Sequence, residues 1–430
     1  MVNQFNREMG LQEKTLIKFH DEMQGSCSIS NVLKIHGDID FETFKKAWKI
    51  AFKRHPLLRA TCEKKESKYF FNCVAGFNDI PIKLINSDDL NAWKKEYEQD
   101  ILIPFDLNKY CWRSTLVKTT NSSSCHIIFA ACHAISDVKS MAWLLGDVLQ
   151  IIISLRKGLF INIDSRPLPQ PLENIIDLAK FSNFTNTETS ASAPSWHLEQ
   201  AHDSEKHQNK NVFKKISPVN LNQLLSVCRE HNVTFTHALT AAFALSLFEM
   251  RRKKDTLFDF YIAVDFRPYT NPVMTNHTLA FYAQPAVIKL ALKDNLDLFE
   301  IAKDVQTQLL RAISAHKIES VDNTENIITF WKTCIANQQP FISNCISNVG
   351  KIDDAFHDIA PYYTLEEYFF TVSQQNTPQG LAIFCSTLND TCYFNFNFSF
   401  PAMSVNWVEQ LVKKIFDSLS RATSIMLVEL

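Results

Sequence analysis

The spacing of apolar and polar residues predicts alternating strands and helices in the first half of the chain. Residues 26–36 and 112–117 have the pattern of strands, and residues 126–132 are apolar throughout, which is typical of a buried strand. A short polar turn joins the last two as a predicted hairpin. Apolar residues recur at helical spacing over 40–54, behind the N-cap residue Asp40, and again from Asp137 onward. Shorter strands are expected at 69–73 and 80–85.

A change of composition divides the chain. Pro, Ser, Thr, Asn and His dominate from about residue 164 to residue 211, which predicts a linker over 166–210 between domains at 1–165 and 211–430. In the second half, Ser217 with Pro218 and then Thr234 begin two predicted helices. Strands are expected at 258–264, 281–291, 341–348, 368–374, 381–386 and 391–398, and a last helix at 405–420. The alternation predicts an α/β fold with mixed sheets.

Composition and charge narrow the class of protein. The chain has 430 residues, of which 46% are hydrophobic and 21% charged, which is typical of a globular enzyme-sized protein. Its formal charge is -2 and no basic block is present, so a nucleic-acid partner is not expected. The N-terminus lacks the basic and apolar regions of an export signal, and the apolar stretch at 141–155 is too short to cross a bilayer. We therefore expect a soluble, cytoplasmic protein without stable membrane insertion.

The cysteines do not suggest a metal site. The 11 cysteines contain no CxxC pair and fit reduced thiols in the cytosol. The pairs Cys125-His126 and Cys132-His133 lie in one predicted strand about 23 Å apart, too far to share an ion. With 8 glycines and no GxGxxG, Walker A, HExxH or GxSxG motif, nucleotide chemistry is not favoured. We expect neither a metal nor a bound cofactor.

Two His-x-x-x-Asp patterns remain as candidate chemistry. His36 ends a predicted strand and Asp40 caps the next helix, so a structural role accounts for both. His133 ends the buried strand and precedes a turn and a helix, where a side chain can be held rigidly beside a cleft. A histidine satisfied within the core, with Asp137 as a second N-cap, fits the same spacing, so both interpretations stay open.

Several motifs in their order resemble those of one family. The segment GDIDFETFKKAWKIAFKRHPLLRATCE, followed by HAISD, resembles the opening of the superfamily that contains chloramphenicol acetyltransferase. Its other branches include condensation domains of nonribosomal peptide synthetases, alcohol acetyltransferases and polyketide-associated acyltransferases. Further matches extend over nearly the whole chain: His55-Pro56-Leu57-Leu58-Arg59, the helix start NVTFTHALTAAFALSL, VDFRP at Val264 to Pro268 and ISNVG at Ile346 to Gly350.

The resemblance implies a fold and an activity. It implies two chloramphenicol-acetyltransferase-like subdomains, with an active-site tunnel at their interface, and a monomer because one chain carries both. It also implies transfer of an acyl group from a coenzyme A or carrier-protein thioester to a hydroxyl or amine. The expected partners are the acyl thioester donor, a small-molecule alcohol or amine acceptor and an acyl carrier protein.

The resemblance assigns roles to residues. His133 is the expected general base, and Asn348, with Ser347 beside it, the expected donor to the oxyanion. Asp137 is expected to pair with Arg267 and so to hold the loop of His133. The alternatives are a surface position before a proline turn for Arg267 and an ordinary strand-end turn for Ser347 and Asn348. His126, His237 and His277 are expected to be structural.

The chain also departs from the family pattern. Cys132 stands where a second histidine often precedes the motif, and Val138 stands where glycine usually follows it. A valine side chain occupies space that an acceptor or backbone would approach, which favours an alternative: an inactive binding or scaffold protein. The Asp-Phe-Gly-Trp-Gly signature of the plant branch is absent. A wax-ester or glycerolipid synthase would prefer a membrane-associating surface, and no long basic amphipathic helix is present to provide one.

Overall fold

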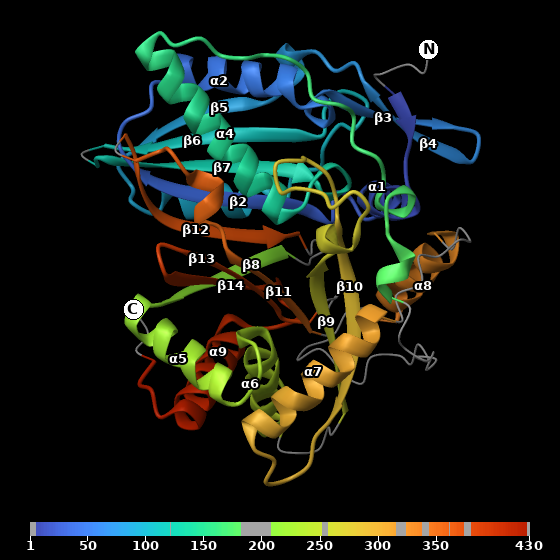
Figure 1. Ribbon diagram of the computed structural model, residues 1–430, viewed down its shortest axis with the longest axis vertical. Coiled ribbons are helices and arrows are strands. Elements are labelled where there is room, and N and C mark those ends of the chain that lie inside the picture. The colour runs from blue at the N-terminus through green and yellow to red at the C-terminus, as the bar shows by residue number, and fades with distance from the viewer. Residues whose placement is uncertain are drawn as a thin grey trace. The chain divides into compact units, whose positions relative to one another are not determined.

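The chain folds into two compact units, each assembled from three separate segments. The computed structural model describes residues 6–120, 122–181, 208–251, 257–314, 324–337, 344–360, 362–373 and 380–427. The first unit comprises Met1–Ile176, Arg267–Tyr282 and Lys351–Ser373. The second comprises Asp177–Phe266, Ala283–Gly350 and Gln374–Leu430 (Figure 1).

The first unit is built on a five-stranded mixed sheet. Its strand order is β12 (Thr364–Val372), β2 (Ser28–His36), β7 (Ser124–Cys132), β6 (Trp112–Thr119) and β5 (Ile82–Ser87). β5 and β6 are parallel, and the pairs joining β12, β2, β7 and β6 are antiparallel. A smaller sheet of β1 (Asn6–Glu8), β4 (Lys68–Cys73) and β3 (Ala60–Lys65) belongs to the same unit.

Helices cover both faces of the five-stranded sheet. Trp48 of α2 (Phe41–Arg54) stacks on Phe129 of β7 at 5.0 Å between ring centroids, and α4 (Val138–Lys157) packs against α2. Three residues before Phe129, His126 points to the other face, because side chains alternate along a strand. There it stacks on Trp93 of α3 (Ala92–Asp100). The remaining helix of this unit is α1 (Leu11–Glu22).

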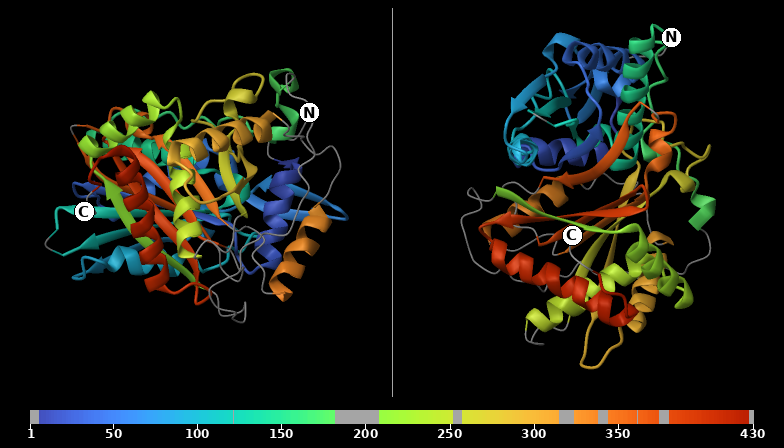
Figure 2. Two further views of the ribbon diagram at one scale, coloured as in Figure 1. Left: turned by 90° about the horizontal axis from the view of Figure 1, so that it is seen from below. Right: turned by 90° about the vertical axis from the view of Figure 1, so that its left-hand side faces the viewer.

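The second unit packs helices on one face of a six-stranded mixed sheet. The strand order is β10 (Ala283–Ala291), β9 (Leu257–Asp265), β11 (Cys345–Lys351), β13 (Ala382–Leu388), β14 (Thr391–Phe400) and β8 (Gln208–Ile216). Its helices are α5 (Pro218–Glu230), α6 (Phe235–Met250), α7 (Leu298–Ser314), α8 (Thr324–Ala336) and α9 (Val405–Thr423). Phe243 of α6 packs on Phe260 of β9, and Phe416 of α9 on Phe394 of β14. Figure 2 shows α5, α6, α7 and α9 gathered on one side of the strands, whereas α8 lies apart from them.

The division of the chain differs from the predicted domains. Residues 267–282 and 351–373 were assigned to the second domain by their position, but they belong to the first unit. The physical reason is long-range strand pairing, since β12 pairs with β2 through eight residue pairs and local composition does not encode such a partner. Most of the predicted linker, residues 182–207, lies outside the described residues, as do residues 341–343 of one predicted strand.

One helix has membrane-like composition. Among the described residues, α4 alone is long and apolar enough to span a bilayer, but 67% of its most apolar window is buried in the structure. α5 and α6 pass the same test only when taken together, and they are bent by 93° at the break between them. These properties are those of core helices.

Candidate active site

His133 lies directly after β7, at the start of a short 3-10 turn over His133–Ile135. Its Nδ1 is 2.8 Å from the carbonyl oxygen of Ser136. Because a carbonyl oxygen only accepts hydrogen bonds, Nδ1 carries the proton and donates, which leaves the lone pair on Nε2. Nε2 has no hydrogen-bond partner among the described residues. The imidazole is therefore oriented with its basic nitrogen unengaged.

The surroundings of His133 favour its neutral form. The ring of Phe281 meets the imidazole edge-on, with ring centroids 5.0 Å apart and an interplanar angle of 78°. Burial lowers the pKa of His133, and this effect outweighs the Ser136 carbonyl and the charge of Asp137, which act in the opposite direction. A neutral imidazole at pH 7 is the form that can accept a proton.

Asp137 is the N-cap of α4, and its carboxylate is fully engaged. It is buried, and it accepts hydrogen bonds from the backbone N–H of Ser140 at 3.0 Å and of Tyr282 at 2.9 Å. The guanidinium of Arg267 adds two contacts, at 2.9 and 3.0 Å. Burial alone would raise the pKa of Asp137, but Arg267 and the two N–H donors lower it below its usual range. Asp137 is thus ionised and binds Arg267 rather than the imidazole.

The predicted contact between Arg267 and Asp137 is present. Arg267 is 3% exposed and binds both carboxylate oxygens, the two-point geometry that a guanidinium favours. The same chain segment, Arg267–Tyr282, makes two further contacts: Phe281 packs on His133, and the Ser140 hydroxyl donates to the carbonyl of Ala280 at 3.2 Å. The segment is therefore attached to the His133 turn at several points.

Val138 is the first residue of α4 and is buried. It is not among the residues with a positive φ. The backbone at this position therefore does not require glycine. The effect of its side chain on an acceptor stays a prediction.

Ser347 and Asn348 lie in β11, in the second unit. The side-chain amide of Asn348 donates to Thr236 Oγ1 at 3.1 Å and accepts from the backbone N–H of Gly350 at 3.0 Å. These contacts are local, but both residues lie within β11 (Cys345–Lys351) rather than in a turn at its end. A pairing of Asn348 with His133 stays a prediction.

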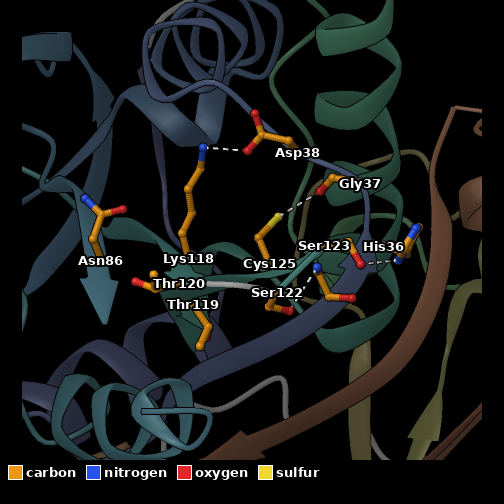
Figure 3. A pocket seen from close by; sticks show the side chains of 11 residues that line it. His36, Gly37, Asp38, Asn86, Lys118, Thr119, Thr120, Ser122, Ser123 and Cys125 are labelled. Carbon is orange, nitrogen blue, oxygen red and sulfur yellow. Dashed lines mark hydrogen bonds and ion pairs between the residues drawn. The ribbon is translucent and has the colours of Figure 1, made fainter. Parts of the chain in front are cut away.

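The second His-x-x-x-Asp pattern has structural partners. Asp40 caps α2 by accepting from the backbone N–H of Thr43 at 2.8 Å. His36 is exposed, and its Nδ1 is 3.1 Å from the hydroxyl of Ser123. It lines a cavity of about 360 Å³ in which Lys118 pairs with Asp38 (Figure 3). This cavity lies at the start of β7, so about 27 Å of strand separates it from His133.

The other histidines also make local contacts. His126 stacks on Trp93, His237 accepts from the backbone N–H of Thr234 at 3.1 Å, and His277 packs on Trp143 at 3.8 Å between ring centroids. No group of three or more His, Cys, Asp or Glu side chains in the described part of the chain is placed to hold a metal ion.

Sequence reasoning missed three participants in the site: Ser140, Phe281 and Tyr282. Ser140 had a detectable signal, because an Asp followed three residues later by Ser at a helix start is a capping pattern. Phe281 and Tyr282 had none. They were expected to begin a strand, but β10 starts at Ala283.

The comparisons with known proteins agree with this architecture. Residues 11–167, which contain His133 and Asp137, match the family model of the condensation domain. Comparison with curated protein sequences gave no match.

Solved structures with the same fold are similar over almost their whole length. Trichothecene 15-O-acetyltransferase from Fusarium sporotrichioides has a TM-score of 0.71 and 14% identity, covering 97% of this chain and 95% of its own. The condensation domain of monacolin K polyketide synthase has a TM-score of 0.71 and 12% identity, covering 99% and 98%. Polyketide synthase associated protein 5 from Mycobacterium tuberculosis has a TM-score of 0.66 and 13% identity, covering 99% of each chain.

The fold thus defines the class as two-subdomain α/β proteins of the acyltransferase and condensation-domain type. Residues 11–167 therefore match the condensation-domain family, and the chain shares the fold of solved condensation domains and of an acetyltransferase, in agreement with the resemblance of its sequence motifs.

Proposed function

We propose that the protein is an acyltransferase that uses His133 as its general base. It moves an acyl group from a coenzyme A or carrier-protein thioester to a hydroxyl or amine. The observation that carries the proposal is the hydrogen bond from His133 Nδ1 to the Ser136 carbonyl, which leaves the Nε2 lone pair of a neutral imidazole unengaged. The similarity to an acetyltransferase and to condensation domains supports it. The thioester is a co-substrate, and the reaction needs no bound cofactor.

His133 alone accounts for both proton transfers of the reaction. Nε2 takes the proton from the acceptor O–H or N–H while the acceptor atom attacks the thioester carbonyl carbon. The tetrahedral intermediate collapses, the carbon–sulfur bond breaks, and the proton on Nε2 passes to the departing thiolate. The products are an ester or amide and a free thiol. General base assistance of this kind contributes about 10²- to 10⁴-fold to the rate.

The remaining residues position the base and stabilise charge. Asp137 and Arg267 hold the His133 turn, and neither takes part in proton transfer. Asn348 is the proposed donor to the oxyanion: its amide nitrogen carries two hydrogens, of which Thr236 takes one. The second hydrogen is available for this role.

A second candidate function rests on Val138. Its side chain fills the position that glycine usually occupies in the family motif and is buried at the start of α4. If it obstructs the acceptor, the protein binds ligands or partners without turnover.

Thiol release separates the two functions. We expect acceptor-dependent thiol release from acyl-coenzyme A or carrier-bound thioesters to fall at least 10²-fold in His133→Ala. His36→Ala is the matched control, because it alters the other His-x-x-x-Asp pattern at an exposed position, and we expect it to be as active as the parent. Equal activity in both variants would exclude His133 as the base. No release by the parent protein with any donor, together with release by Val138→Gly, would establish the inactive binding protein.

A further inference from the structure

The chain forms an exposed apolar tip immediately after α4. Leu159 is 55% exposed, Phe160 93% and Ile163 48%. Single exposed apolar residues are normal on a protein surface. Three large ones within five residues, with a phenylalanine almost wholly in solvent, form a local apolar surface.

The backbone of this tip is held in place. Gly158 ends α4 in the left-handed conformation, with φ of 62°, and the backbone N–H of Leu159 donates to the Ser154 carbonyl at 2.9 Å. Arg54 donates to the carbonyl of Asn162, whose side chain accepts from the backbone N–H of Asp164 at 2.8 Å. The apolar side chains are therefore presented by a fixed turn.

Cationic side chains border the tip. Segment 156–166 contains Arg156, Lys157 and Arg166 against a single acid, Asp164, which leaves two net positive charges. Arg156 and Lys157 are exposed at the end of α4, where the guanidinium of Arg156 also donates to the Asp38 carbonyl and lies over the Tyr363 ring. The ammonium of Lys157 lies 4.2 Å from the centroid of the Tyr362 ring, which is itself 44% exposed. The surface thus combines an apolar point, aromatic rings and positive charge.

The area of the tip indicates which partner it fits. A stable protein interface buries roughly 800 Å² on each side. Even an aromatic side chain buries only about 150–250 Å², so three side chains fall short of that area. A protruding apolar tip with cations beside it fits a bilayer surface, where apolar side chains enter the boundary of headgroups and acyl chains and cations meet anionic lipids.

We propose that residues 156–163 bind the surface of an anionic phospholipid bilayer. Leu159, Phe160 and Ile163 enter the interface, and Arg156 and Lys157 contact the headgroups. The contact is peripheral and reversible, so it is distinct from insertion of a helix. It uses no residue of the His133 site and is independent of the proposed acyl transfer.

Vesicle cosedimentation of the full chain tests the proposal. The parent protein is mixed with phosphatidylcholine vesicles, with and without phosphatidylserine. We expect binding only with phosphatidylserine, weakened by salt and reduced about tenfold or more in Leu159→Ser/Phe160→Ser. Lys157→Glu should also bind more weakly.

The matched control is Val74→Ser/Leu90→Ser, which removes two apolar side chains of the same unit that are 71% and 70% exposed. This control should bind as the parent does, and all variants should keep the parent's melting temperature and thiol release. The proposal is overturned if the parent does not bind, if it binds both vesicles equally, or if the control loses as much binding. Self-association of the parent that Phe160→Ser abolishes would identify the tip as a contact between copies and would also overturn it.

Discussion

His133 takes its orientation from a backbone carbonyl rather than from a carboxylate. The Ser136 carbonyl fixes the tautomer without placing a formal negative charge beside the ring. A neighbouring carboxylate would favour the imidazolium and raise the pKa. Asp137 is the nearest acid in the motif, but Arg267 and two backbone N–H groups engage it. The base can therefore stay neutral in this half-buried position.

This arrangement predicts the pH dependence of the reaction. Burial lowers the pKa of His133 below its ordinary value of 6.5. Only the neutral imidazole accepts a proton, so kcat/KM should fall as the pH drops through the lowered pKa, with the acid limb below pH 6.5. The measurement is kcat/KM against pH with a donor and acceptor that do not titrate in this range. An acid limb above pH 6.5 would contradict the assignment.

Phe281 is expected to determine the pH at which kcat/KM falls on the acid side of the profile. Phe281→Ala admits water to His133, so the pKa of the imidazole should rise toward 6.5 and the acid limb should move to higher pH. Phe281→Leu keeps an apolar cover and should shift the limb less. Loss of kcat in both variants with no movement of the limb would indicate that the ring only orients the imidazole.

His126 should make the fold sensitive to acid. It is 6% exposed, neither ring nitrogen has a partner among the described residues, and burial lowers its pKa to about 3. The unfolded chain binds the proton near pH 6.5 and the folded chain only near pH 3, so stability is lost as the pH falls below 6.5.

His126→Phe removes this proton linkage and retains a ring against Trp93. The variant should gain about 2 kcal/mol relative to the parent between pH 7 and pH 5. Denaturant unfolding at the two pH values measures the difference. If the free energy of unfolding changes by the same amount between pH 7 and pH 5 in the parent and in His126→Phe, His126 is hydrated in the folded state.

At the scale of elements, the start of α4 and the Arg267 segment depend on each other. Asp137 caps the helix and also holds the guanidinium, and both charged groups are buried. Arg267→Met leaves the carboxylate buried and unpaired, which should destabilise the protein by about 3–5 kcal/mol. Arg267→Lys keeps one charge but loses the two-point contact, so its loss should be smaller. Chemical denaturation measures the free energy of unfolding of both variants. If Arg267→Met loses less stability than a surface variant such as Arg229→Met, the structural role of Arg267 is refuted.

Elements whose apolar residues recur at a regular helical or strand spacing were predictable. The pattern of α2, α4, α6 and α9 and of β2 and β7 could be recognised from the sequence, and each begins close to its expected residue. α7 was missed although its apolar residues recur at helical spacing, with Leu298, Ala302, Val305 and Leu309 on its buried face. α3 offered little pattern, because Trp93 and Tyr97 are its only buried apolar residues.

The site was predictable only where a motif is contiguous or belongs to a family pattern. His133 and Asp137 share one short motif, and Arg267 followed from the VDFRP resemblance. Phe281 and Tyr282 reach His133 and Asp137 from about 145 residues away, as the Tyr282 contact shows. No local property of the sequence encodes that proximity, since it results from the chain returning to the first unit.

At the scale of the whole molecule, this return is what makes the first unit complete. The chain leaves the unit after Ile176, re-enters it for Arg267–Tyr282 and again for Lys351–Ser373. The second return supplies β12, which covers the open edge of β2. An uncovered edge strand exposes unpaired N–H and C=O groups and promotes aggregation.

A fragment that ends at residue 176 should therefore not fold alone, even though it contains His133, Asp137 and the condensation-domain match. It lacks the partner of Asp137 and the partner of β2. Expressed by itself, it should aggregate or show no cooperative thermal transition. Joining residues 351–373 to it through a flexible Gly/Ser linker restores β12 and should improve solubility, and adding residues 267–282 should restore a cooperative transition. A matched fusion in which residues 364–372 are scrambled should show neither the improved solubility nor the cooperative transition. A cooperative melt of the unaided 1–176 fragment near that of the full chain would show that the returning segments are dispensable for the first unit.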